Sequence, residues 1–439
     1  MDPCTALAHA ATIRLPGSSQ RLLDVWLPFG FLGVVSWIVW LARRLLAACY
    51  RPHLDDFDAP VSVVVPAYRE DPEILANAVR SWVAAGAEEI VIVMPVDEAY
   101  NRERACALAH LLDADVRILP SVKTAKRDCL DLGIRSASHE IVVLSDSDTL
   151  WEPDLLSEVL RPFADTQVGG VGTRQRVLDP YSSLWRRAAD WLLDSRYLCY
   201  VPAMSRRGGV SCLSGRTVAY RRSILLPVLP ELVDEVFLGR RCIAGDDGRL
   251  TWLVLRAGWK CVHQQSALAW TMMPDTARAF FAQRIRWSRN SYRCYLTAIY
   301  KRWLFRQPMI TRVSVLQSLL APLSLCVGYG FTLLALIRGD LLAAGAWIAW
   351  VMFGRGLRAF DHLRHNPRNL LLVPFMTVLI LGGFTLIRFY TFLTMNKHAW
   401  ITREAGKAVA AGQAAGSLDA HAMAQWDHEG VRVLQEAEA

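Results

Sequence analysis

Long apolar stretches on both sides of a polar middle region constrain the fold of this chain more than any other feature. Val25–Leu46 is apolar, is long enough to span a bilayer, and carries the basic pair Arg43-Arg44 near its end. This stretch begins too late to be an ordinary signal peptide and lacks a small-residue cleavage pattern. We therefore expect a membrane anchor whose basic end faces the cytosol.

Three further apolar segments are found in the last third of the chain, at Val313–Ile337, Leu341–Phe353 and Leu370–Leu393. The region Gly354–Asn369 carries several arginines and is expected to be a cytosolic loop. A single crossing by the last segment would place the C-terminus outside, whereas the basic residues that follow it favour the inside. The pattern predicts a multi-pass protein of the cell (inner) membrane and leaves the side of the C-terminus open.

The composition agrees with a membrane protein and argues against nucleic acid as a partner. Apolar residues make up 53% of the 439 residues, and the formal net charge is +8. The arginines are spread along the chain and gather at the ends of apolar segments, which is the bias of cytosolic flanks in membrane proteins. The ten cysteines include no C-x-x-C pair, so neither a zinc site nor a disulfide framework is indicated.

The middle region, from about Asp55 to Asp275, has the pattern of an α/β domain. Short, nearly all-apolar runs predict strands at 61–65, 89–94, 115–119 and 141–144, and helical stretches alternate with them. Such runs are typical of a mainly parallel sheet that helices cover on both faces. Because ligands of these sheets bind at the carboxyl ends of the strands, we expect a site there.

Two aspartates follow the strand predicted at 141–144. Asp146 and Asp148 are separated by one residue, so in an extended segment both side chains point to the same side. Clustered carboxylates repel each other, and a divalent cation with oxygen ligands would relieve this repulsion and bring a diphosphate with it. Taken alone, an acidic turn after a strand explains the pair equally well.

A second acidic motif, Gly245-Asp246-Asp247, precedes the apolar run Thr251–Leu255, which we predict to be a helix. A flexible glycine before paired carboxylates suits a loop that presents one of them to a hydroxyl as a general base. The pair would also lie near a helix N-terminus, where negative charge is simply stabilising. Both interpretations stay open for this motif by itself.

A stretch rich in arginine and aromatic residues, Phe280–Trp303, is expected to form amphipathic helix in the membrane interface. It contains Q-R-I-R-W at 283–287. Arginine can clamp a diphosphate through charge-assisted hydrogen bonds, and tryptophan offers a flat face to a sugar ring. A solvated amphipathic helix without any ligand is the alternative.

In their order along the chain, these motifs resemble those of the processive membrane family-2 glycosyltransferases. That family includes hyaluronan synthases, nodulation chitooligosaccharide synthases and, more distantly, bacterial cellulose synthases. The resemblance covers roughly residues 60–403 and ends with W-I-T-R at 400–403. The other motifs that carry it are V-V-V-P-A-Y-R-E at 63–70, Lys126-Arg127, Asp146-Ser147-Asp148, Ser214-Gly215, Gly245-Asp246-Asp247 and Q-R-I-R-W at 283–287.

The resemblance implies a GT-A catalytic fold that uses a UDP-sugar donor and Mg²⁺ or Mn²⁺. It makes Asp247 the catalytic base, with Asp246 beside it, and Asp148 the metal ligand. Tyr68 would stack on uracil, and Trp287 would meet the acceptor at the mouth of a membrane channel. The full set expected to bind substrate is Tyr68, Glu70, Asp97, Lys126, Asp146, Ser214, Gly215, Gln283, Arg286, Trp287, Trp400 and Arg403.

Two positions depart from the family pattern. The family often has an Asp pair directly after the second strand, and Asp97 is displaced from that place. Hyaluronan synthases typically read S-G-P and G-D-D-R, where this chain has Ser214-Gly215-Arg216 and G-D-D-G. These departures leave the identity of the polymer open but not the class of reaction.

The sequence therefore predicts an inverting, processive β-glycosyltransferase that builds an extracellular polysaccharide, hyaluronan-, chitin- or cellulose-like, and translocates it. The alternative is a non-processive enzyme that adds one sugar to a lipid-linked acceptor. Expected partners are the UDP-sugar, the growing polysaccharide and the lipid bilayer. The predicted organisation is an N-terminal extension (1–24), an anchor (25–48), a cytosolic GT-A domain (55–275), interface helices (276–308), transmembrane segments (309–395) and a partly disordered cytosolic tail (396–439).

Overall fold

The computed structural model describes residues 32–112, 114–339 and 341–397. The predictions for Trp400, Arg403, the N-terminal extension and nearly all of the tail therefore lie outside the described residues. The first described element is α3 (Leu32–Ala48), so the first part of the predicted anchor lies outside them as well.

One eight-stranded sheet organises the middle of the chain, in the order β3-β2-β1-β4-β7-β6-β10-β5. β7 is antiparallel to both of its neighbours, and β5 is antiparallel to β10, while the other pairs are parallel. The predicted sheet is thus confirmed, and most of its strand pairs are parallel, but the antiparallel β7 and β5 make it a mixed sheet. The strands are β1 (Val61–Pro66), β2 (Glu89–Pro95), β3 (Asp115–Ser121), β4 (Ile141–Ser145), β5 (Thr149–Trp151), β6 (Val168–Val177), β7 (Thr217–Arg221) and β10 (Lys260–Thr271); a separate ribbon joins β8 (Val236–Phe237) and β9 (Arg240–Arg241).

Helices cover both faces of this sheet. β1 shows why, because its successive valines are fully buried and point to opposite sides: Val63 joins the apolar core with α4, and Val64 joins the core with α6. The helices of this region are α4 (Pro72–Ala84), α5 (Ala99–Ala109), α6 (Lys126–Ser136), α7 (Leu155–Leu160), α8 (Leu184–Ser195), α9 (Val201–Ser205), α10 (Arg222–Leu225), α11 (Leu229–Val233), α12 (Asp246–Arg256) and α13 (Ala277–Tyr300), with a π-helical turn, η4 (Arg196–Tyr200), after α8.

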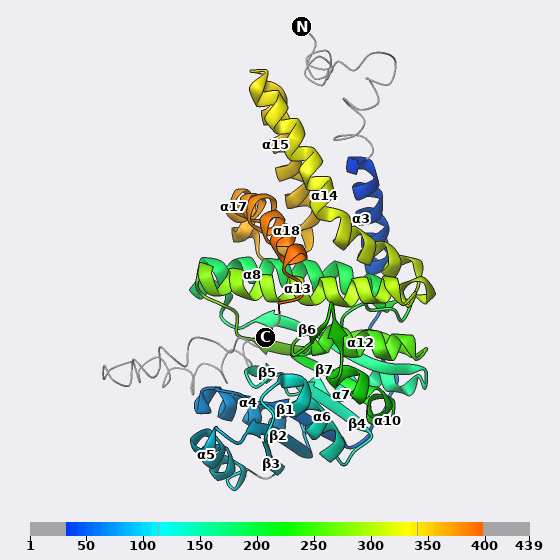
Figure 1. Cartoon of the computed structure of the whole chain (residues 1–439), viewed down its shortest axis with the longest axis vertical. Coiled ribbons are helices and arrows are strands. Elements are labelled where there is room, and N and C mark those ends of the chain that lie inside the picture. Colours follow the sequence, from blue (N-terminus) through cyan, green and yellow to red (C-terminus); the bar gives the residue numbers. More distant parts are fainter. Residues whose placement is uncertain (1–31, 113, 340, 398–439) are drawn as a thin grey trace, which may run out of the picture.

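Two long helices separate the sheet from the remaining helices. Figure 1 shows α8 and α13 lying across the molecule, with the sheet below them and α3, α14 (Met309–Ile337) and α15 (Leu341–Arg358) above. Trp185 of α8 packs against Phe280 of α13, with ring centroids 5.2 Å apart. The stretch predicted to be an amphipathic interface helix is therefore one continuous helix, α13, and it lies between the two halves of the molecule.

Two helical segments in the described residues are long and apolar enough to cross a membrane, by length and composition. They are Met309–Ile337, which is α14, and Pro367–Leu393. The second is built from η7 (Pro367–Leu372), α17 (Val373–Val378), the π-helical η8 (Leu379–Phe384) and α18 (Thr385–Leu393). The predicted segments 313–337 and 370–393 are therefore found as helices of spanning length.

The prediction of a loop at Gly354–Asn369 is wrong, because most of this range is helical. α15 continues through Gly354 to Arg358, and α16 (Phe360–His365) follows almost at once. The arginines did not end the helix, because Arg358 donates a hydrogen bond to Ser36 Oγ of α3 at 2.7 Å and lies 5.0 Å from the Trp37 ring. Long-range contacts with another helix thus extended the helix beyond its apolar part.

A glycine allows α6 to lie directly on β1. A Cβ atom at Gly133 would stand 2.4 Å from Cγ1 of Val64 and 3.1 Å from Cγ2 of Val93. Both neighbours are β-branched and have little freedom to turn away. This close approach fixes the height of α6 above the sheet, and with it the place of the Lys126 side chain at the first turn of α6.

We predict that Gly133→Ala lowers the free energy of unfolding by about 1–3 kcal/mol, the usual cost of overpacking a core. Thermal unfolding of the purified protein measures the effect. Gly330→Ala is the matched control, since position 330 is helical and has nothing within 4 Å of its Cβ. Equal unfolding temperatures for the two variants would contradict the close-packing argument.

Candidate active site

The first acidic motif lies at the carboxyl end of β4, as the sequence predicts. The Asp146 amide donates to the carbonyl of Arg216, which ties this end of β4 to the start of β7. Between the two aspartates, Ser147 donates from Oγ to Glu70 Oε2 at 2.8 Å, which links the motif to the segment that follows β1. The carboxyl ends of neighbouring strands β1 and β4 thus meet at one place, with their acidic groups held by short hydrogen bonds.

The second acidic motif forms the first turn of α12, which confirms its predicted place at a helix N-terminus. Gly245 precedes the helix with φ +81°, a left-handed conformation that glycine adopts without strain. A Cβ at this position would also stand 2.8 Å from Cγ of Asn290 on α13. Gly245 therefore serves two needs: it turns the chain into α12, and it lets α13 pack against the acidic turn.

Lys126 joins the two acidic motifs. Its Nζ lies 2.7 Å from Asp146 Oδ1 and 3.2 Å from Asp246 Oδ2. Burial alone would lower the pKa of the Lys126 amine, but the charges of Asp146 and Asp246 outweigh burial and raise that pKa. The amine is therefore charged at neutral pH and holds the end of β4 against the start of α12.

The pKa values of two carboxyl groups at this bridge, Asp146 and Asp247, are shifted in opposite directions. Burial alone would raise the pKa of Asp146, yet Lys126, Arg216 and Arg286 hold it below its usual value. For Asp247, burial and the charge of Asp246 raise the pKa above its usual value. A carboxylate with a raised pKa is a better proton acceptor, which is the property a general base needs.

Small groups lie next to Asp247. The Gly248 amide donates to Asp247 Oδ1 at 2.7 Å, and Cys212 Sγ lies 3.8 Å from Oδ2. A Cβ at Gly215 would stand 3.3 Å from both Asp246 Oδ2 and Asp247 Cβ. The predicted motif Ser214-Gly215 therefore lies beside the acidic turn through Gly215, although the motif and the turn are about thirty residues apart in sequence.

Positive charge gathers around Trp287 of α13. The guanidinium groups of Arg216 and Arg284 lie 4.8 and 4.6 Å from its ring. Burial and repulsion from Arg216 and Arg196 lower the pKa of Arg284 to about 9. Gln283 Oε1, also on α13, is buried and has no hydrogen-bond partner in the described part of the chain. The wall opposite the carboxylates is thus cationic, aromatic and incompletely hydrogen-bonded.

The remaining predicted residues lie around the same edge of the sheet. Tyr68 follows β1, and the Arg69 guanidinium lies 5.0 Å from its ring. Asp97 is exposed in the turn after β2. The structure therefore places Tyr68 and Glu70 beside the first acidic motif, and leaves Asp97 at the rim.

Two arginines of this site were not among the predicted residues. Arg216 acts on the charge of Asp146, and its Nη1 donates to Gln175 Oε1 at 3.2 Å. Arg284 stacks on Trp287. Both stand inside motifs that the sequence singled out, so the available signal was their position next to Gly215 and Gln283.

Away from this edge, three possible metal ligands come together in the described residues: Asp190 and Asp194 of α8 and His362 of α16. His362 Nδ1 lies 2.8 Å from Asp194 Oδ2, and its Nε2 lies 2.8 Å from Asn369 Nδ2. Nothing in the sequence pattern connects these residues, since the aspartates and the histidine belong to distant helices.

Hydrogen bonding determines which nitrogen of His362 carries the proton. Arg187 donates twice to Asn369 Oδ1, at 3.2 and 2.8 Å, so Asn369 turns its amide nitrogen toward His362. Nε2 must then accept, and Nδ1 must donate to Asp194. With its proton on Nδ1 the ring donates to Asp194, so this cluster forms a hydrogen-bonded link between α8 and α16.

Comparison with known proteins identifies the domain. A family model described as glycosyltransferase like family 2 matches residues 59–290, more than half of the chain. The chain is 27% identical over 359 residues to an N-acetylglucosaminyltransferase of Rhizobium leguminosarum bv. viciae, covering 78% of this chain and 81% of the relative. It is 24% identical over 385 residues to a hyaluronan synthase of Streptococcus pyogenes serotype M3, covering 85% and 91%.

Among solved structures, the chain is similar to a mannosyltransferase from Pyrobaculum calidifontis in complex with GDP-Man and Mn²⁺. The TM-score is 0.56 at 18% sequence identity, and the match covers 82% of this chain and 96% of the other. This likeness concerns the fold, and with the sheet order it confirms the predicted Rossmann-like GT-A architecture.

The Lys126 bridge should stabilise the folded protein. We predict that Lys126→Gln lowers the free energy of unfolding by about 2 kcal/mol, less than the loss for a fully buried pair because Asp146 is partly exposed. Lys123→Gln is the control, since the side chain of Lys123 is 66% exposed where it pairs with Asp128. Chemical denaturation at neutral pH measures both variants, and an equally small loss for each would contradict the bridge.

The link between α8 and α16 should make stability depend on pH. Burial, with the charge of Asp194, raises the pKa of Asp190 to about 6, so folding favours its protonated form. This stabilisation is complete below the ordinary carboxyl pKa and is lost as pH rises through about 6. We predict that Asp190→Asn removes this slope, so unfolding temperatures measured from about pH 4 to pH 7 fall less steeply than in the wild type. Parallel curves of unfolding temperature against pH for the variant and the wild type would contradict this role of Asp190.

Proposed function

The chain belongs to the glycosyltransferase-like family 2, and from this premise we propose that it is an inverting, processive β-glycosyltransferase. It transfers a sugar from a UDP-sugar to the end of a growing polysaccharide on the cytosolic side of the cell membrane. The relatives named N-acetylglucosaminyltransferase and hyaluronan synthase support a synthase of this kind, because the similarity extends over most of each chain.

The observation that carries the proposal is the ionic bridge of Lys126 between Asp146 and Asp246. The bridge holds the two acidic motifs together at the edge of the sheet where ligands of such sheets bind, which supports a donor site at Asp146 and a base in the second motif. Asp247, next to Asp246, has the raised pKa that a proton acceptor requires. In the proposed reaction, Asp247 accepts the proton of the acceptor hydroxyl while that oxygen attacks the anomeric carbon and UDP leaves from the opposite side.

The cationic groups of the site suit the leaving diphosphate. Lys126, Arg216 and Arg286 all act on Asp146, so their charges converge near one point. Fixed positive charge of this kind stabilises negative charge that develops on a leaving group. We propose that these side chains bind the donor diphosphate and exchange part of their contact with Asp146 for it.

The residues at the end of β4 fit a divalent cation. Asp148 offers hard carboxylate oxygen, the donor that Mg²⁺ and Mn²⁺ prefer, beside the expected diphosphate. When bound there, the ion would add positive charge to the leaving group. The cluster of Asp190, Asp194 and His362 is formed by α8 and α16 and not by the acidic motifs at β4 and α12, so Asp148 remains the proposed ligand.

The acceptor would lie against α13. Trp287 offers a flat aromatic face, and Gln283 contributes a buried Oε1 that still needs a donor, such as a sugar hydroxyl. α13 also borders the helices of spanning length, through contacts between Tyr292 and Phe392 of α18. A polymer that leaves this site would therefore meet the membrane part directly, which favours repeated addition and translocation.

The base assignment is tested with Asp247→Asn. We predict that this change lowers the rate of UDP release from UDP-sugars by roughly 10²–10⁴-fold, the range of general-base catalysis. UDP binding, measured by titration calorimetry, should stay close to that of the wild type. Asp131→Asn is the matched control, because Asp131 lies on α6 in a surface pair with Arg135, and it should leave the rate unchanged.

Two results would overturn parts of the proposal. Turnover of Asp247→Asn near the wild-type rate would exclude Asp247 as the base. Product length decides processivity: a long labelled polymer supports it, whereas a single-sugar adduct on lipid would identify a non-processive enzyme. A panel of UDP-sugars in the same assay gives the donor.

A further inference from the structure

A group of arginines lies where α3, α14 and α15 meet, away from the site described above. We call Arg43, Arg355 and Arg358 the arginine cluster. The charge of Arg358 repels that of Arg355, and the charge of Arg43 repels that of Arg358. Three like charges have therefore been brought together in a poorly solvated place.

The hydrogen bonds of the cluster go to neutral groups within the described residues. Arg43, only 1% exposed, donates from Nη2 to Ser314 Oγ at 3.2 Å and to Gln317 Oε1 at 2.7 Å. Arg358 donates to Ser36 Oγ. In both side chains Nε is buried and has no partner in the part of the chain that the structure describes.

The nearby carboxylate is already occupied. Asp361 accepts a hydrogen bond of 2.6 Å from Arg44, which neighbours Arg43 on α3. Among the described residues, no ion pair joins Asp361 to an arginine of the cluster. Buried cations without an anion are costly, and this cost is highest near a membrane. A negatively charged ligand would offset this cost.

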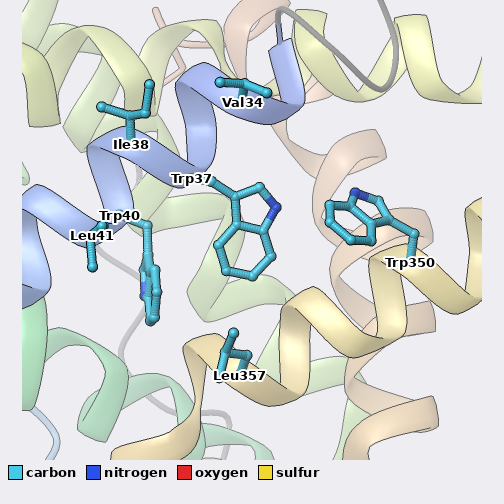
Figure 2. Close-up of a pocket in the computed structure, with 7 residues that line it drawn as sticks. All are labelled: Val34, Trp37, Ile38, Trp40, Leu41, Trp350 and Leu357. Atoms are coloured by element: carbon cyan, nitrogen blue, oxygen red, sulfur yellow. The ribbon is translucent and has the colours of Figure 1, made fainter. Parts of the chain in front are cut away.

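An apolar groove begins beside the cluster. It has a volume of about 360 Å³ and lies between α3 and α15, as Figure 2 shows. Trp37 and Trp350 face each other across it, with ring centroids 5.9 Å apart. The other lining residues are Val34, Ile38, Trp40, Leu41 and Leu357. Ile38 is 60% exposed and Leu41 51%, so the groove is open on its outer side.

Trp37 connects the groove with the cluster. Its ring lines the groove and also lies 5.0 Å from the guanidinium of Arg358. An apolar groove that leads to the arginine cluster is complementary to an amphiphile with an anionic headgroup. Guanidinium groups bind phosphate oxygens in pairs, and basic pockets between membrane helices on the cytosolic side suit anionic headgroups.

We propose that α3 and α15 bind an anionic phospholipid, with its phosphate at the arginine cluster and one acyl chain in the groove beside Trp37 and Trp350. The inference rests on the membrane location proposed above. It adds a lipid site to the protein, remote from Asp247, through which the composition of the membrane sets the packing of α3 against α14 and α15.

The test measures binding of phosphatidylglycerol and phosphatidylcholine to the purified full-length protein, by titration followed with native mass spectrometry. The wild type should retain phosphatidylglycerol preferentially. Arg355→Gln combined with Arg358→Gln should weaken phosphatidylglycerol binding by about 10–100-fold, the loss of two charge-assisted hydrogen bonds, and leave phosphatidylcholine unaffected. Arg207→Gln, an exposed arginine after α9, is the control with the same kind of charge change.

Each alternative occupant gives a distinct result. Inorganic phosphate that competes fully with phosphatidylglycerol would show a free-anion site and overturn the lipid assignment. Equal retention of phosphatidylcholine, or an equal loss in Arg207→Gln, would overturn it as well. If the double variant unfolds in detergent, Leu41→Ser in the groove replaces it and should also weaken phosphatidylglycerol. Binding is measured without donor, so failure of UDP release leaves this result intact.

Discussion

The contact of Lys126 with Asp146 and Asp246 is the interaction on which the arrangement of the site depends. It joins the start of α6, the end of β4 and the start of α12, three segments that the sheet alone would not hold together. Without a cation between them, the carboxylates of the two motifs would repel each other. Lys126 helps to hold the pKa of Asp146 below its usual value, whereas burial and the charge of Asp246 raise the pKa of Asp247 although Lys126 acts to lower it.

The sequence predicted the elements whose signals are local. The valine run of β1 and the apolar runs of β2, β3 and β4 can be read without knowing their partners, and α4 begins where Asp71 accepts a hydrogen bond from the Glu73 amide. The acidic motifs were predictable for the same reason, since the strand end and the helix start that position them lie beside them in the chain.

What the sequence could not supply depends on distant partners. β6 contains several glycines and reads as a poor strand, but Gly170 is required because the ring of Tyr220 on β7 lies where a Cβ would be, 2.7 Å away. α15 continues past Gly354, and Arg358 near its end donates a hydrogen bond to Ser36 on α3. The bridge from Lys126 to Asp246 is of the same kind, because no spacing rule links a helix start to a motif so far along the chain.

The link between α8 and α16 gives the protein an order of assembly. Asp194 precedes His362 by 168 residues, so it leaves the ribosome well before its partner exists. Until His362 and Asn369 have been synthesised, Asp194 lacks its hydrogen bond to the imidazole, and the ring of Trp191 lacks its neighbour at 5.1 Å. A chain cut short within α14 or α15 would carry a completed sheet but lack these contacts of α8. An unfinished copy therefore differs from a finished one in the unpaired polar groups on α8.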